Sequence, residues 1–223
     1  MKKVIAVFVL CMMAAPGFAG IGFHFNYDAT TIDGEANLIE FGDGYGGIVR
    51  SEMNGLVGGG IDITFGMIPM IDLALSLEAA YGSYDAGYVS NVPGAGTFLP
   101  EEETLPYLRA GADLTATYTV LPLPGIGGVF VGGGPSFMAV APVFSSDLIL
   151  DNVDSASEEV DEADLVDEIQ MEFGLHLALG AKLKPTGFPL AFRVGMKYYI
   201  IPSLEDPAPG NWLTLQAGIV LGG

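Results

Sequence analysis

Met171–Lys184 reads MEFGLHLALGAKLK, and this stretch decides the fold. Apolar residues occupy every odd position from Met171 to Leu183, whereas the even positions, from Glu172 to Lys184, are small or polar. Successive side chains of a β-strand point to opposite faces, so a strand here has one wholly apolar face and one face that carries charge. The run exceeds the usual strand length of about 5–6 residues. It also reaches the roughly 9–11 residues that cross a bilayer as a tilted strand.

The same alternation recurs along the rest of the chain. Seven further strands are predicted, at 21–28, 54–67, 71–81, 107–118, 128–140, 190–200 and 212–222. Short connections follow the second, fourth and sixth strands, and long loops, at 29–53, 82–104, 142–170 and 202–210, follow the others. Outer-membrane barrels have short turns at one rim and long loops at the other. We therefore predict an all-β fold, an eight-stranded antiparallel up-and-down transmembrane β-barrel.

Glycine and proline set two details of this plan. Turn signals rich in glycine leave room for a short hairpin within 29–53. Gly132, Gly133 and Gly134 blur the two faces of the fifth predicted strand, and Pro135 follows them. Proline cannot donate to a strand ladder, so we expect a β-bulge or a strand end at Pro135.

Residues 1–19 have the features of a secretory signal peptide. Two lysines precede an apolar run, Pro16 interrupts that run before the roughly 20 residues of a membrane helix, and Gly17-Phe18-Ala19 is a small-x-small cleavage site. Cys11, the only cysteine, lies in this segment, so the mature chain 20–223 has no thiol for a disulfide or a Cys-based site. We expect export to the outer membrane of a Gram-negative bacterium.

The charge balance argues against nucleic acid as a partner. The chain has 8 Lys and Arg against 27 Asp and Glu, and without Lys2 and Lys3 its net charge is −21. Binding to a phosphate backbone needs a basic surface, which this chain does not offer. An anionic lipid surface would also repel acidic loops unless divalent cations intervene.

The acids are densest in the 142–170 loop, which is a candidate for weak divalent-cation binding. Carboxylate oxygens suit Ca²⁺ and Mg²⁺, although the spacing of an EF-hand is absent. A solvated acidic surface is the default interpretation, and weak cation binding that bridges the loop to lipopolysaccharide phosphates is a hypothesis. The candidate residues are Asp147, Asp151, Asp154, Glu158, Glu159, Asp161, Glu162 and Asp164.

Placing the apolar faces outward sends a nearly balanced set of charges into the barrel. The set is Asp62, Asp72, Glu78, Arg109, Asp113, Glu172, His176, Lys182, Arg193 and Lys197. Buried charges are costly unless they are paired and hydrogen-bonded, so we expect these groups to form a network. His24 also faces inward. A titrating gate or a catalytic base is one interpretation of the two histidines, and we favour simple hydrogen bonding to nearby carboxylates.

The strand rhythm and the polar interior resemble the small eight-stranded outer-membrane barrels of the OmpA/OmpX type, over essentially Gly20–Gly223. The resemblance implies an interior filled by side chains rather than an open, porin-like channel. It also implies a monomer in contact with outer-membrane lipid and lipopolysaccharide. Members of that class usually end on an aromatic residue that assists insertion, whereas this chain ends Leu221-Gly222-Gly223.

The sequence predicts neither an enzyme nor a cofactor. A resemblance to the outer-membrane lipid A deacylases would require a serine two residues after a histidine, where this chain has Asn26 and Ala178. A carrier of apolar ligands would need an apolar interior. Two hypotheses therefore remain. The favoured one is a plugged barrel with a structural or surface-interaction role, and the alternative is a narrow, charge-lined conduit for ions or small solutes.

Overall fold

The computed structural model describes residues 18–41, 44–68, 70–92, 96–98, 103–141, 143, 169–204 and 208–222. Residues 1–17 of the expected signal peptide and all eight acidic candidates for cation binding lie outside these ranges. Every regular element within these ranges is a β-strand. Within the described ranges, no helix is long and apolar enough to cross a membrane.

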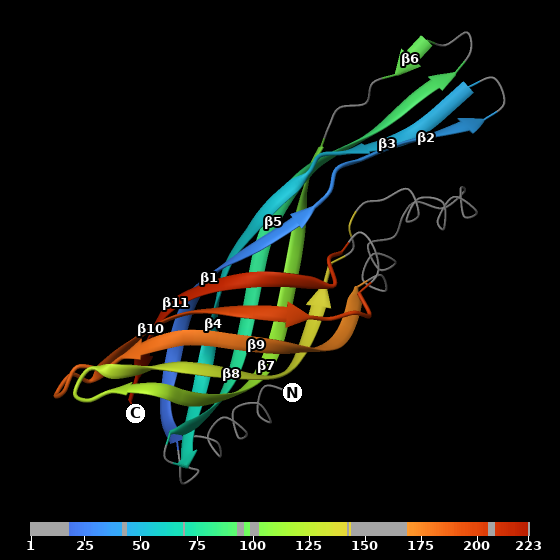
Figure 1. The fold of residues 1–223 in the computed structure, drawn as a ribbon. Coiled ribbons are helices and arrows are strands. Elements are labelled where there is room, and N and C mark those ends of the chain that lie inside the picture. Colours follow the sequence, from blue (N-terminus) through green and yellow to red (C-terminus); the bar gives the residue numbers. More distant parts are fainter. Residues whose placement is uncertain are drawn as a thin grey trace, which may run out of the picture.

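Eight strands close into an antiparallel barrel, as Figure 1 shows. They are β1 (Phe18–Ile32), β4 (Met53–Ile68), β5 (Ile71–Val92), β7 (Glu103–Leu123), β8 (Gly127–Val140), β9 (Gln170–Leu183), β10 (Leu190–Ile200) and β11 (Asn211–Leu221). Each pairs with the next barrel strand along the chain, and β1 pairs with β11 to close the ring. The predicted eight-stranded up-and-down fold is therefore confirmed.

Three further strands extend the sheet beyond the ring. β2 (Glu35–Phe41) and β3 (Gly44–Arg50) form a hairpin, and β3 and β6 (Gly96–Phe98) both pair with the distal part of β5. Figure 1 shows this extension projecting past the end of the barrel. The hairpin allowed for in 29–53 is present, but the prediction of a loop across 82–104 was wrong. Along this part of β5 the two faces exchange polarity: Tyr84 and Ala86 are buried, whereas Ser83 and Asp85 are exposed. A search for an apolar outer face therefore misses it.

Side-chain contacts fasten the base of this extension. The Ser51 amide donates to the Asp85 carbonyl over 2.7 Å, and the Asp85 amide donates back to the Ser51 hydroxyl over 2.8 Å. The Thr104 hydroxyl donates to the Asp85 carboxylate over 2.6 Å. Arg50 pairs with Glu35 at 3.3 Å. The extension is therefore joined to the barrel by more than strand continuity.

Pro135 causes neither the expected bulge nor a strand end. It faces Leu175 within an unbroken pairing of β8 with β9. Pairing with β7 is interrupted between Ser136 and Gly133, yet the register is the same on both sides of the interruption. The N–H and C=O of one strand residue point to the same neighbouring strand, so a missing proline N–H weakens pairing on one side only. The register shift of this pair of strands lies elsewhere, between Thr119 and Leu121.

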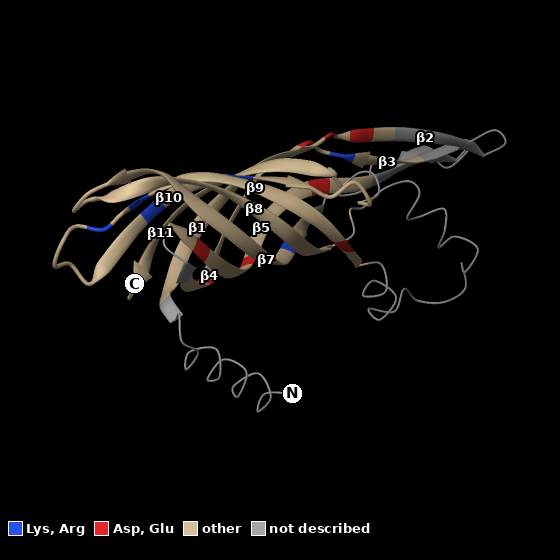
Figure 2. Cartoon of the chain, turned by 60° about the horizontal axis from the view of Figure 1, so that its bottom comes forward, with Lys and Arg blue, Asp and Glu red and all other residues tan. Residues whose placement is uncertain are grey.

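The barrel interior has an apolar layer near its long-loop rim. Fourteen buried residues form this cluster: Ile32, Met53, Leu56, Ala80, Tyr84, Ala86, Tyr107, Met138, Val140, Val143, Tyr199, Ile201, Ala208 and Trp212. Below it, toward the short turns, the inward positions carry charge, and Figure 2 shows where acidic and basic residues lie on the strands. The core of the protein is therefore inside the ring, with an apolar layer above a polar one.

Candidate functional site

The centre of the polar layer is Lys197 on β10. Its Nζ lies 2.7 Å from Asp113 Oδ2 on β7 and 3.5 Å from Glu78 Oε2 on β5. The Tyr199 hydroxyl, two residues along β10, lies 2.6 Å from Asp113 Oδ2 and 2.5 Å from Glu78 Oε1. Gln216 on β11 donates its side-chain amide to Glu78 over 3.0 Å. One cation and one phenol thus join two buried carboxylates across the ring.

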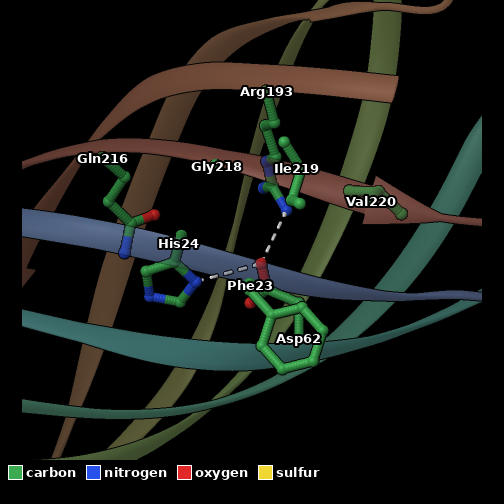
Figure 3. A pocket seen from close by; sticks show the side chains of 8 residues that line it. All are labelled: Phe23, His24, Asp62, Arg193, Gln216, Gly218, Ile219 and Val220. Carbon is green, nitrogen blue, oxygen red and sulfur yellow. Dashed lines mark hydrogen bonds and ion pairs between the residues drawn. The ribbon is translucent and has the colours of Figure 1, made fainter. Parts of the chain in front are cut away.

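A second group of charges surrounds Asp62 on β4, as Figure 3 shows. His24 Nδ1 on β1 lies 3.2 Å from Asp62 Oδ2, and an Arg193 guanidinium nitrogen lies 3.8 Å from the same oxygen. The Ser76 hydroxyl donates to the other carboxylate oxygen over 2.5 Å. His24 Nε2 lies 3.5 Å from Glu78, which connects this group to the Lys197 centre.

His176 on β9 lies in a hydroxyl-lined part of the same interior. Its Nδ1 is 2.8 Å from the Ser136 hydroxyl, and its Nε2 is 2.9 Å from the Thr115 hydroxyl. Asp113 lies 3.9 Å away, on the Nδ1 side. A Ser-His-Asp triad places the acid and the nucleophile on opposite ring nitrogens. Here Ser136 and Asp113 share one nitrogen, and all four residues are fully buried, so the arrangement suits packing better than nucleophilic catalysis.

The third group lies closer to the apolar layer. The Arg109 guanidinium pairs with the Asp28 carboxylate, which also accepts a hydrogen bond from the Thr214 hydroxyl. Arg109 also stacks 3.8 Å from the ring centroid of Trp212. Trp212 in turn stacks on Tyr199, with ring centroids 4.9 Å apart. This stack links the Arg109 pair to the Lys197 centre.

The structure thus brings together seven of the ten predicted interior charges. They are Asp62, Glu78, Arg109, Asp113, His176, Arg193 and Lys197, and His24 joins the same network. Lys182 and Asp72 form a separate, partly exposed pair at 4.0 Å near the short turns. Glu172 is half-buried, and no hydrogen bond or ion pair joins its side chain to another described residue.

Sequence reasoning missed Asp28 and the uncharged residues that form hydrogen bonds with the interior charges. Asp28 continues the polar face of the first predicted strand, so the alternation itself could have included it. Ser76, Thr115, Ser136 and Thr214 also occupy inward positions, but nothing in a single sequence distinguishes a hydroxyl that completes a network from one that faces solvent.

Little free space remains inside the polar layer. The cavities beside His24 and beside Arg109 each measure about 10 Å³, which is room for about one water molecule. A larger cavity of about 250 Å³ lies at the short-turn end, where Thr64, Thr119 and Lys182 are among its lining residues. Around His24 and Arg109 the interior is therefore filled by side chains.

The outward face has the opposite character. Large apolar side chains are exposed on all eight barrel strands, including Phe25 at 59%, Phe173 at 74% and Leu177 at 62%. The odd positions of the 171–183 stretch all point outward, and His176 and Ala178 point inward. Compared with a soluble protein, the polarity of this barrel is inverted.

No protein-family model matches the chain, and no curated protein is significantly similar to it. Among the described residues, no group of three or more His, Cys, Asp or Glu side chains could hold a metal ion. The residues themselves therefore define the class, a closed antiparallel barrel with an ion-paired interior and an apolar exterior.

Proposed function

We propose that this protein is an outer-membrane β-barrel of the OmpA/OmpX type, exported through a cleaved signal peptide, with a structural or surface-interaction role. The observation that carries the proposal is the inverted polarity. Monomeric soluble proteins rarely expose a contiguous apolar patch larger than a few hundred Å², whereas here exposed apolar side chains encircle the ring. A hydrocarbon environment explains both the apolar exterior and the charged interior.

The backbone supports the same environment. In hydrocarbon every N–H and C=O must be paired within the protein, which a closed barrel achieves. Each barrel strand has 11 or more residues, enough for the roughly 9–11 of a tilted crossing. Aromatic residues such as Tyr27, Tyr81 and Tyr118 lie among the exposed outer side chains, as in the aromatic girdles of membrane barrels.

The extension of β2, β3 and β6 supports a surface-interaction role. By the rule that long connections face outward from the cell, this sheet would project beyond the outer leaflet. β5 is 22 residues long, and its residues 86–92 pair with β3 or β6 outside the ring. Divalent bridging between the acidic loop and lipopolysaccharide remains part of the proposal. An unchanged melting temperature in chelator and in millimolar Ca²⁺ would exclude it.

The filled interior favours a plugged barrel over the alternative of a conduit. The voids beside His24 and beside Arg109 are each of water size. We expect no stable unitary conductance for the refolded chain in a planar bilayer, and replacement of Arg109 or Arg193 should not create one of defined size. Reproducible channels that disappear when Arg109 or Arg193 is changed would instead establish the conduit.

The proposal is tested by refolding the mature chain in detergent and comparing its gel mobility before and after boiling. We expect a compact species that shifts on heating, a β-rich circular dichroism spectrum, and precipitation when detergent is removed. A chain that stays monomeric and folded without detergent would refute the membrane assignment, because its apolar exterior would then tolerate water.

A further inference from the structure

The cavity at the short-turn end has a composition unlike the rest of the chain. It measures about 250 Å³ and is lined by three cations, Lys182, Lys184 and Arg193, and by one carboxylate, Asp72. Three of the chain's eight Lys and Arg therefore meet at one cavity in a chain with a net charge of −19. Figure 2 shows blue segments gathering at this end of the barrel, near β10. We name this cavity the basic vestibule.

The cations of the basic vestibule are only partly neutralised. Lys182 lies 4.0 Å from Asp72, and the two side chains are 29% and 43% exposed. Lys184 forms no ion pair with another described residue. Arg193 reaches Asp62 at 3.8 Å and lies 4.7 Å from the centroid of the Phe130 ring. By contrast, Lys197 lies 2.7 Å from its carboxylate and is almost fully buried.

Hydroxyl groups line the same cavity. The Thr117 hydroxyl donates to the Asp72 carbonyl over 3.2 Å, and the Thr64 hydroxyl donates to the Gly20 carbonyl over 3.1 Å. Thr119 also lines the cavity, and its hydroxyl has no hydrogen-bond partner in the described part of the chain. Counting Asp72 and also Asp62, the ion-pair partner of Arg193, against its three cations, the basic vestibule combines a net charge of +1 with a free hydroxyl donor.

We propose that the basic vestibule binds a small soluble oxyanion, a phosphate or a carboxylate. Lys and Arg form strong charge-assisted hydrogen bonds with such oxygens. A water molecule has a share of about 30 Å³ in the liquid, so the cavity has room for an anion of a few heavy atoms. Positive charge in a low-dielectric cleft concentrates anions locally, whereas the rest of this acidic protein repels them. The site lies on the inward faces of the strands, whereas lipid around the ring would contact their outward faces.

The test is isothermal titration of the refolded mature chain with inorganic phosphate, and separately with acetate, at low ionic strength in a nonionic, phosphate-free detergent. We expect saturable binding at one site. Lys182→Gln and Lys184→Gln should each weaken binding about threefold or more, as for loss of a partly exposed charge pair, while Lys182→Arg retains it. Asp72→Asn removes the competing carboxylate and should strengthen binding by a similar factor.

Arg50→Gln is the matched control, because it removes one positive charge from the opposite end of the molecule, where Arg50 pairs with Glu35. Absence of saturable binding, or an equal loss in Arg50→Gln, would overturn the proposal. Displacement of phosphate by added phosphatidylglycerol would also overturn it in favour of a lipid headgroup. Gel mobility with and without boiling is measured on every variant. It tests the proposed function independently of anion binding, since the basic vestibule does not depend on what surrounds the barrel. Only its orientation toward the periplasm rests on that proposal.

Discussion

Replacing Lys197 with methionine tests whether the interior charges stabilise the barrel as a paired unit. The change keeps most of the side-chain volume but leaves Asp113 and Glu78, at 0% and 8% side-chain exposure, without their cation. Breaking a buried pair costs about 3–5 kcal/mol. The Tyr199 hydroxyl remains within hydrogen-bond distance of both carboxylates and limits the loss. We therefore expect Lys197→Met to lower the free energy of unfolding by about 4 kcal/mol, within this range. With an m value of about 2 kcal/mol/M, the urea midpoint should fall by about 2 M.

The assay is urea unfolding of the refolded barrel, followed by the fluorescence of Trp212, the only tryptophan, which stacks on Tyr199. Lys182→Met is the control, because its pair with Asp72 is longer and partly exposed, and it should cost at most about 1 kcal/mol. Adding Asp113→Asn to Lys197→Met should recover part of the loss, since only one carboxylate, Glu78, then lacks Lys197, and His24 Nε2 still lies 3.5 Å from it. If Lys197→Met costs no more than the control, the interior is hydrated and the pairing argument is wrong.

Three further predictions concern other parts of the barrel. Leu177→Lys places a charge on the outer face, at a position 62% exposed, and should lower stability in lipid vesicles by about 2–4 kcal/mol, whereas a protein with a water-facing exterior would change by less than about 0.5 kcal/mol. Gly60→Val should cost about 1–3 kcal/mol in urea unfolding, because a new Cβ meets the Leu77 carbonyl oxygen and the His24 ring. Gly187→Asn should cost less, about 1 kcal/mol or below, because a Cβ there meets nothing within 4 Å and asparagine tolerates the left-handed backbone of Gly187, φ +81°, better than most residues. Arg109→Met should destabilise the barrel by about 3–5 kcal/mol and shift the emission of Trp212. Arg109→Lys should restore only part of the stability and part of the emission shift, because lysine cannot stack as a planar guanidinium does.

Alternation along the chain was enough to predict the barrel, because each strand within the ring has one apolar and one polar face. The alternation did not predict the parts of the strands that extend beyond the ring. β5 continues to Val92 and β7 begins at Glu103, and along this part of β5 the two faces exchange polarity, because Tyr84 and Ala86 are buried on the inner face whereas Ser83 and Asp85 are exposed. Pro135 misled for a related reason, since a single missing N–H is tolerated on one side of a strand that remains paired on the other.

The inward direction of the interior charges also followed from alternation, but their partners did not. Arg109 and Asp28 are 81 residues apart, and Lys197 and Glu78 are 119 apart. Which of them meet depends on how far each strand is staggered against its neighbour, a quantity that closure of the ring sets and a single sequence does not display. Glu172 illustrates the point, because it lies on the predicted face but too far along β9 to reach the network.

The seam between β1 and β11 has a consequence for how the chain folds. The first and last strands of the ring pair with each other, and the Thr214 hydroxyl bonds Asp28 across a separation of 186 residues. Contacts between such distant segments are entropically costly and slow to form. Until β11 arrives, one edge of β1 stays open and the Asp28 carboxylate lacks one of its two partners. Folding should therefore be cooperative, with the pairing of β1 and β11 as the step that completes the barrel.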